Sequence, residues 1–368
     1  MQSPYVIPSM SDVAQSRGKN GFTMVSTFSG AGGSCLGFEM AGFEIVWASE
    51  FVEEARRTYE ANHPGVTVDG RDIREVTAEE ILAATGLQRG ALHLFEGSPP
   101  CASFSTAGMQ EKGWGKVKAY SDREQRSDDL FFEYARLLEG LQPQVFTAEN
   151  VAGLVKGKAI GYFKEILAAL RACGYAVDAK VVDASWLGVP QARQRLIFVG
   201  VRNDIANRYK IRPAHPKPRR PRYTIREVLK IDHVTKTTCE ITHDPETGQD
   251  VRLDRYAIAA AWDKIRPGQS SERYFQLVRP ALDEPVGTIT ATAGNIGAAG
   301  VTHPTQRRKF TLKELRVLSS FPEDFILTGT YAQRWERIGR SVPPIMARAI
   351  AETIRDEILK KMTAQKQR

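Results

Sequence analysis

A cysteine stands in a short loop that the sequence makes both stiff and open. Cys101 follows Gly97-Ser98-Pro99-Pro100 and precedes small polar residues, and the apolar segment 92–96 comes directly before the loop. Two prolines restrict the backbone that presents the thiol, and the small neighbours leave its sulfur accessible. An isolated cysteine is more often a small core residue, but core cysteines rarely occur in such a loop. We therefore predict that Cys101 is a nucleophile.

One glutamate and two arginines stand beside two further apolar segments. Glu149 follows residues 145–148, and a glutamate at the carboxyl end of a strand faces the crevice in which α/β proteins bind ligands. Arg193 and Arg195 lead into residues 196–201, and alternate residues of a strand point to the same face. Two interpretations are open for each side chain. Glu149 faces a ligand or forms a salt bridge, and the arginines are structural ion-pair partners or grip an anion or a base carbonyl.

A glycine-rich turn, Phe28-Ser29-Gly30-Ala31-Gly32-Gly33, lies between a predicted strand and a predicted helix. Such a turn lets a ligand approach the backbone and leaves the helix N-terminus open to it. Glu50 ends the next predicted strand, where an acid can hold ribose hydroxyls, and Asp72 lies in a later loop, where it could accept from an adenine amino group. Each feature alone also fits a ligand-free turn or a solvated acid. Together they predict an adenosine site, although the spacing differs from the dinucleotide fingerprint G-x-G-x-x-G.

These residues need a sheet to hold them, and the first two hundred residues predict one. Short apolar runs alternate with helical patterns from residue 22 to about residue 200, which is typical of a parallel sheet covered on both faces. The expected strands are 24–28, 44–49, 92–96, 145–148, 177–182 and 196–201, and the expected helices are 34–41, 52–61, 130–138 and 160–173. Beyond Gly200 the pattern is irregular. There we expect a strand at 286–290, a helix at 311–319 opened by a capping threonine with Glu314, and a terminal helix at 344–362.

The charge of the chain favours an acidic partner. The 368 residues carry a formal net charge of +8, and residues 201–230 alone hold ten lysines and arginines against two acids. This stretch is either a solvated basic loop or a surface for a polyanion. The four scattered cysteines show neither metal-ligand spacing nor a dense disulfide pattern, so a reducing compartment fits best. No segment resembles a signal peptide or a membrane span. We expect a cytoplasmic protein that has no membrane partner.

In their order along the chain, these motifs resemble those of the cytosine-C5 DNA methyltransferase family, known mainly from bacterial restriction–modification and orphan modification enzymes. The resemblance runs from Phe22 to about Arg355. It includes Leu130-Phe131-Phe132, Arg279-Pro280 with Pro285 and Thr288-Ile289-Thr290, and Gly339-Arg340-Ser341-Val342-Pro343. A glycine turn or one tripeptide recurs by chance, but the ordered set is specific. The resemblance implies an α/β fold: a Rossmann-like sheet that binds S-adenosylmethionine, with helices on both faces, plus a small irregular target-recognition domain.

The resemblance also implies a reaction and a role for each residue. The enzyme would transfer methyl from S-adenosylmethionine to C5 of a cytosine flipped out of a specific duplex DNA sequence. Cys101 would bond to C6 of the ring, Glu149 would hold N3 and the exocyclic amine, and Arg195, supported by Arg193, would bind O2. The product would be S-adenosylhomocysteine, and no metal is required. The cofactor pocket would comprise Phe28, Gly30, Gly32, Gly33, Glu50, Phe51, Asp72, Ile73, Leu130, Ser341 and Val342.

The family pattern divides the chain into four segments. They are an N-terminal tail (1–21), a catalytic and cofactor-binding domain (22–201), a target-recognition domain (202–278), and C-terminal motifs with a helix that returns to the catalytic domain (279–368). Residues 102–129 would close over the flipped base. The basic stretch falls at the entrance of the third segment, which favours contact with the DNA backbone. We expect a monomer that acts on double-stranded DNA, with any cognate restriction endonuclease acting separately.

Two positions depart from the family pattern. Ala102 follows the cysteine where glutamine is frequent, and Arg340 stands where the family strongly prefers asparagine; we expect both to be tolerated. Three other functions are alternatives. An RNA methyltransferase is disfavoured by the nearly eighty residues between two motifs, and a regulatory protein without the chemistry by the retention of Cys101, Glu149 and Arg195. A nicotinamide-dependent dehydrogenase would explain neither the Pro-Pro-Cys loop nor the arginine pair.

Overall fold

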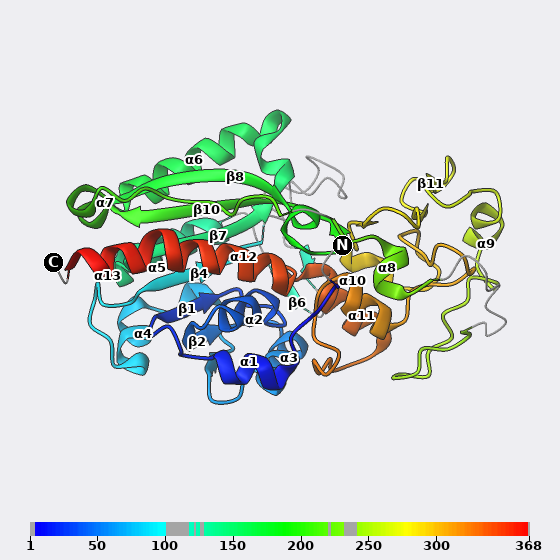
Figure 1. Ribbon diagram of the computed structural model, residues 1–368, viewed down its shortest axis with the longest axis horizontal. Coiled ribbons are helices and arrows are strands. Elements are labelled where there is room, and N and C mark those ends of the chain that lie inside the picture. The colour runs from blue at the N-terminus through cyan, green and yellow to red at the C-terminus, as the bar shows by residue number, and fades with distance from the viewer. Residues whose placement is uncertain are drawn as a thin grey trace. The chain divides into compact units, whose positions relative to one another are not determined.

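The computed structural model describes residues 4–100, 118–120, 123–125, 129–219, 222–231 and 241–366. The predicted nucleophile, Cys101, and most of the segment expected to close over the base lie outside these residues. The chain divides into two compact units, each assembled from separate stretches. The first, here called the sheet unit, comprises residues 13–182, 194–216 and 348–368, and the second unit comprises residues 1–12, 183–193 and 217–347. Figure 1 labels elements of both units.

The sheet unit contains a seven-stranded sheet in the order β3-β2-β1-β4-β7-β10-β8. The strands are β1 (Thr23–Thr27), β2 (Glu44–Ser49), β3 (Thr67–Asp69), β4 (Leu94–Gly97), β7 (Val145–Val151), β8 (Tyr175–Asp183) and β10 (Gln194–Arg202). Neighbours from β3 through β7 run parallel, whereas β10 runs antiparallel to β7. The six predicted strands are therefore confirmed, but the prediction of a parallel sheet is wrong for β10. The three residues of β3 are too few and too polar to form an apolar run in the sequence.

Helices cover this sheet on both faces. Successive side chains of a strand point to opposite faces of the sheet. Every residue of β1 after Thr23 is buried, so both faces of the sheet are covered at this strand. The helices are α2 (Gly33–Met40), α3 (Glu53–Asn62), α4 (Ala78–Thr85), α5 (Leu130–Leu141), α6 (Ile160–Ala172), α7 (Asn203–Tyr209) and α13 (Lys360–Lys366), with short helical turns η1 (Ile73–Glu75), η2 (Ala152–Val155) and η3 (Gly157–Ala159). Buried residues of α5 recur every three or four positions, and they join Phe95 of β4 and Phe146 of β7 in one apolar cluster. The predicted helices at 34–41, 52–61, 130–138 and 160–173 are thereby confirmed to within a few residues.

The second unit has few regular elements. Its strands form two short pairs, β9 (Gln191–Ala192) with β13 (Val286–Gly287) and β11 (Gln269–Ser270) with β12 (Val278–Arg279). Its helical elements are η4 (Ala184–Leu187), α8 (Ile225–Leu229), α9 (Ile258–Trp262), η5 (Ala291–Gly294), α10 (Leu312–Leu318) and α11 (Tyr331–Arg340). The predicted capping box is confirmed, because Thr311 and Glu314 exchange hydrogen bonds at the start of α10. The strand predicted at 286–290 is confirmed only for its first two residues.

Long-range polar contacts stabilise this irregular unit. The backbone N–H of Leu312 donates to Oδ2 of the buried Asp244 (2.8 Å), and the guanidinium of Arg279 lies 3.9 Å from the ring centroid of Trp262. Contacts of this kind join residues that are distant in sequence, which is why hydrophobic patterning does not reveal them.

The remaining elements lie at the ends of the chain and in the segment after Pro100. Helices α1 (Met10–Ser16) and α12 (Pro344–Ile354) belong in part to each unit. A π-helical turn, η6 (Arg355–Leu359), follows α12 and precedes α13, so the single terminal helix predicted at 344–362 is wrong in that it is interrupted. A two-stranded hairpin of β5 (Lys118–Tyr120) and β6 (Arg123–Gln125) lies within the segment 102–129. Among the described residues, no helix has the length and apolar character needed to cross a membrane.

Candidate active site

The glycine-rich turn lies at the carboxyl end of β1 and leads into α2. Phe28, Gly30 and Gly32 all have positive φ angles, of 55°, 56° and 86°. A Cβ atom on Gly32 would lie 2.3 Å from Nε2 of the buried His63, so only glycine fits there. At Gly30, apart from its chain neighbours, no atom of the described residues lies within 4 Å of such a Cβ, so these residues leave the space beside its backbone open. The turn therefore leaves room for a ligand close to the backbone at Gly30.

Glu50, which directly follows β2, is buried and fixed in one orientation. Its two carboxylate oxygens each accept one backbone N–H, from Gly30 (2.7 Å) and from Val52 (2.8 Å). A carboxylate oxygen can accept more than one hydrogen bond, so this group has the chemistry to accept from ligand hydroxyls. Glu50 thus connects the glycine turn to the start of α3 and presents an acceptor at the same edge of the sheet.

The residues expected around an adenine come from η1 and from the start of α5. Ile73 and Leu130 are buried in the same apolar cluster. Asp72 forms an ion pair with Arg74 (3.0 Å), and Arg74 pairs in turn with Asp129 (2.6 Å), directly before α5. An open glycine turn, a buried carboxylate acceptor and an apolar wall suit an adenosyl ligand, so the residues present fit S-adenosylmethionine.

Glu149 and Arg195 form an ion pair near the carboxyl end of β7. Nε of Arg195 lies 2.6 Å from Oε1 of Glu149, and the two side chains are only 14% and 17% exposed. The antiparallel register of β10 places Arg195 opposite Val151, two residues beyond Glu149. Burial lowers the pKa of Arg195, and the carboxylate of Glu149 opposes this effect. The structure therefore holds an anion and a cation side by side, largely out of water.

The site contains two further side chains for which the sequence reasoning assigns no role. Asn150 is buried, and its Nδ2 donates to the carbonyl oxygen of Pro99 (3.2 Å), which ties β7 to the loop before the predicted nucleophile. Glu96 of β4 is buried and accepts from the hydroxyls of Ser26 (2.6 Å) and Ser34 (2.8 Å). The signal for both residues is the same: each is a polar side chain at the end of an apolar run and beside a motif.

Two further predicted residues lie in the sheet unit, since Gly33 begins α2 and Phe51 directly follows Glu50. Arg193, Ser341 and Val342 belong to the second unit. Arg193 is buried, and its Nη1 and Nη2 donate to the carbonyl oxygens of Ile289 and Arg340, both at 3.3 Å. Ser341 and the buried Val342 follow directly after α11. The structure thus brings Arg193 together with the 288–290 motif and with the end of α11, where it supports the backbone.

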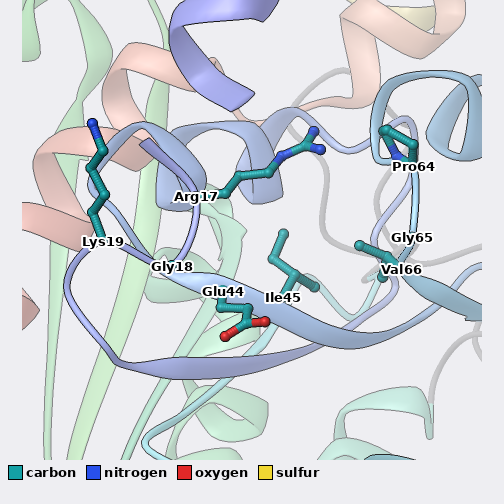
Figure 2. Close-up of a pocket in the computed structure, with 8 residues that line it drawn as sticks. All are labelled: Arg17, Gly18, Lys19, Glu44, Ile45, Pro64, Gly65 and Val66. Carbon is teal, nitrogen blue, oxygen red and sulfur yellow. The ribbon is translucent and has the colours of Figure 1, made fainter. Parts of the chain in front are cut away.

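A surface pocket of about 450 Å³ lies at the opposite edge of the sheet (Figure 2). It is lined by Arg17, Gly18, Lys19, Glu44, Ile45, Pro64, Gly65 and Val66. Glu44 begins β2 and Val66 directly precedes β3, so this pocket opens at the amino ends of the strands. Glu50 and Glu149 lie near carboxyl ends, so the pocket is separate from the predicted cofactor site.

The chain matches the model of the C-5 cytosine-specific DNA methylase family over residues 22–356. This match covers nearly the whole chain, and the chain therefore belongs to that family. It is a DNA (cytosine-5-)-methyltransferase that uses S-adenosylmethionine, and its substrate is DNA.

Relatives and solved structures agree with this assignment. The Type II methyltransferase M1.HphI of Haemophilus parahaemolyticus is 29% identical over 339 residues, which cover 90% of this chain and 86% of the relative. The Type II methyltransferase M.NgoPII of Neisseria gonorrhoeae is 29% identical over 350 residues, covering 91% and 96%. A prophage-encoded E. coli protein described as a DNA modification methyltransferase shares the fold, with a TM-score of 0.69 and 21% identity over 92% of this chain and 99% of that one. The family and the fold class predicted from the motifs are thereby confirmed.

Arg340 departs from the asparagine that the resemblance leads us to expect, but its side chain makes a replaceable contact. Its Nε pairs with Oε1 of Glu336 one helical turn earlier (2.7 Å), and Nη2 of Arg193 donates to its backbone carbonyl oxygen (3.3 Å). Surface pairs of this kind contribute about 0.3–0.5 kcal/mol. We therefore expect Arg340→Asn to change the free energy of unfolding by less than about 1 kcal/mol and turnover by less than about threefold. Thermal unfolding and steady-state methyl transfer test this, and a large gain in turnover would show that Arg340 impairs catalysis.

Proposed function

We propose that the enzyme methylates C5 of a cytosine turned out of duplex DNA, through a covalent bond between the sulfur of Cys101 and C6 of the ring. The observation that carries this proposal is the 2.6 Å ion pair of Glu149 and Arg195. A cytosine presents O2, N3 and an exocyclic amine along one edge. A carboxylate beside a guanidinium complements that edge, because Glu149 can hold the amine and N3 while Arg195 donates to O2.

The chemistry must first activate C5, which is a weak nucleophile. Addition of the Cys101 thiolate to C6 breaks the aromatic system and leaves an enamine whose C5 can accept a methyl group. Glu149 and Arg195 stabilise the charge that moves into the ring. A base then removes the proton from C5, and the C6–S bond breaks to release Cys101. A free thiol has a pKa of about 8.5, so the loop must also favour the thiolate or remove its proton.

The glycine turn and its neighbours would hold the methyl donor. When bound, S-adenosylmethionine supplies an electrophilic methyl group and leaves as S-adenosylhomocysteine. Glu50 accepts from the ribose hydroxyls, Asp72 accepts from the adenine amino group, and Ile73 and Leu130 form the apolar wall. The backbone and side chains of Phe28, Gly30, Gly32, Gly33, Phe51, Ser341 and Val342 complete this proposed site. None of the roles assigned here needs a metal ion.

Residues 202–278 are proposed to choose the DNA sequence, and residues 102–129 to close over the base. Within the basic stretch, Arg222 pairs with Glu284 (3.2 Å) and Arg226 with Asp283 (2.6 Å). The positive charge available to DNA phosphates is therefore smaller than the sequence alone indicates. We further propose that the enzyme acts as a monomer in the cytoplasm and independently of any restriction endonuclease.

Trapping on duplex DNA that contains 5-fluorocytosine tests the proposed chemistry. Fluorine at C5 does not leave as a proton does, so the enzyme remains bonded to C6 after methyl transfer. We expect a denaturant-resistant complex with fragmented DNA of varied sequence in the presence of S-adenosylmethionine, and the trapped fragments identify the recognition sequence. Duplex DNA without 5-fluorocytosine should compete with the trapping substrate, whereas transfer RNA should not.

Two cysteine variants distinguish loss of the nucleophile from a general effect of replacing a cysteine. Cys101→Ser should form no adduct, whereas Cys173→Ser, which changes the half-buried cysteine at the end of α6, should trap DNA as the wild type does. An adduct that survives in Cys101→Ser would overturn the assignment. So would the absence of an adduct in a wild-type protein that binds both the donor and DNA.

A further inference from the structure

A buried carboxyl group lies directly beneath the glycine turn. Glu96 of β4 pairs in register with Ser26 of β1, and its side chain is 3% exposed. Oε2 accepts from the Ser26 hydroxyl (2.6 Å), and Oε1 accepts from the Ser34 hydroxyl (2.8 Å). The hydroxyls of Ser26 and Ser29 also lie 2.8 Å apart. The carboxyl group therefore bonds to the chain on both sides of the turn and fixes where the turn lies.

No cation balances this carboxyl group among the described groups that act on its ionisation. Those groups are Ser26, Ser34 and Glu149 of β7. Burial, and to a smaller extent Glu96 in turn, raises the pKa values of Cys35 of α2, Tyr59 of α3 and Tyr134 of α5, so these three groups are neutral near pH 7. Glu149 is itself paired with Arg195. Burial, with a smaller contribution from Glu149, raises the pKa of Glu96 to about 7, although the two serine hydroxyls oppose this.

A buried anion without a counter-ion is costly, and a cation bound nearby lowers that cost. The methyl donor carries one more positive charge than its product, because the sulfonium becomes a neutral thioether when the methyl group leaves. We propose that Glu96 is a positioning residue that fixes the glycine turn and whose negative charge favours the cationic methyl donor over the neutral product on that turn. This inference rests on the cofactor site proposed above.

The consequence is a preference for donor over product that depends on pH. Below pH 7 Glu96 is largely protonated and does not distinguish the two ligands by charge. Above pH 7 it is ionised, so donor affinity rises relative to product affinity. A favourable interaction between the Glu96 carboxylate and the sulfonium of the donor corresponds to a change of about three- to tenfold in the ratio of the two dissociation constants.

Calorimetric titration of both ligands, S-adenosylmethionine and S-adenosylhomocysteine, tests this on the full chain without DNA. The measured quantity is the Kd of the product divided by the Kd of the donor, from about one pH unit below to about one unit above the pKa of Glu96. We expect the ratio to rise about three- to tenfold in the wild type and to stay flat in Glu96→Gln. Glutamine preserves the shape and can accept from one serine hydroxyl while it donates to the other. Comparison with Glu96→Gln also cancels the titration of the ligands' own amino groups.

Ser34→Ala provides the matched control, because it removes one hydrogen bond to the turn and leaves the charge of Glu96. It should weaken both ligands and retain the rise of the ratio with pH. A flat ratio in the wild type would overturn the inference, even if Glu96→Gln did not fold. A rise that persists in Glu96→Gln would also overturn it. If neither ligand bound at any pH, the proposed cofactor site itself would be wrong.

Discussion

Replacing Glu149 with glutamine should lower the rate of methyl transfer by about 10²–10⁴-fold and leave the affinity for S-adenosylmethionine within about threefold. The carboxylate is the anion of the ion pair with Arg195, at 2.6 Å. Glutamine is nearly the same size but carries no charge, so it neither stabilises charge on the cytosine ring nor holds the guanidinium. Single-turnover methyl transfer measures the chemical step, and calorimetry measures donor binding.

Loss of a largely buried partner also leaves Arg195 without its counter-ion, and we expect a loss of up to about 3 kcal/mol in the free energy of unfolding. Thermal unfolding must therefore be followed in parallel, at a temperature where the variant is folded. Glu133→Gln on α5 is the matched control, because it breaks a more exposed ion pair with Arg136 (2.7 Å). Near-normal turnover in Glu149→Gln would contradict the role proposed for this carboxylate.

Replacing Glu50 with alanine should raise the Kd for S-adenosylmethionine by about 100-fold or more. The substitution removes the proposed acceptors of the ribose hydroxyls. It also leaves the backbone N–H groups of Gly30 and Val52 without their carboxylate, so the glycine turn loses one of its supports. Hydrogen bonds to a charged group contribute about 1.5–3 kcal/mol each, and two of them account for an effect of this size. Calorimetric titration measures it directly.

Glu53→Ala serves as the comparison for Glu50→Ala. Glu53 stands three residues later in the first turn of α3, and its exposed carboxylate pairs with Arg57 (2.5 Å). Its removal changes the net charge equally but should leave donor affinity within about twofold. Equal effects of the two substitutions would mean that Glu50 acts only through net charge and would refute its place in the site.

Local patterns of the sequence were sufficient for much of the sheet and for the turn that it positions. The strands at Glu44–Ser49 and Val145–Val151 each contain a short, largely buried apolar run, and Gly32 is required by a close approach that only glycine permits. The direction of β10 could not be predicted in this way, because a strand buried on both faces has the same apolar pattern whichever way it runs. Its direction depends on how the chain returns from β8 through residues 183–193.

In the candidate site, the sequence likewise predicts which side chains matter but not which partners they contact. The sequence left open whether Glu149 and Arg195 form an ion pair or bind a ligand, and the structure shows the ion pair, which suits a ligand edge as well. The partners of Arg193 lie about one hundred residues or more later in the chain, at Ile289 and Arg340. Glu96 reads as the polar end of a strand until its two serine partners are placed beside it.

Glu96 also sets a thermodynamic cost on folding. Its pKa is about 7 in the folded protein, against an ordinary value of 4.5, so the folded state retains a proton that the unfolded chain releases between these two pH values. The contribution of this group to stability is therefore greatest in acid and falls as the pH rises, by a total on the order of 3 kcal/mol above neutrality. An uncharged residue at this position would make a more stable protein, but it would leave no anion under the turn. The fold gives up part of its stability at this one position to keep a charge where a cationic ligand can balance it.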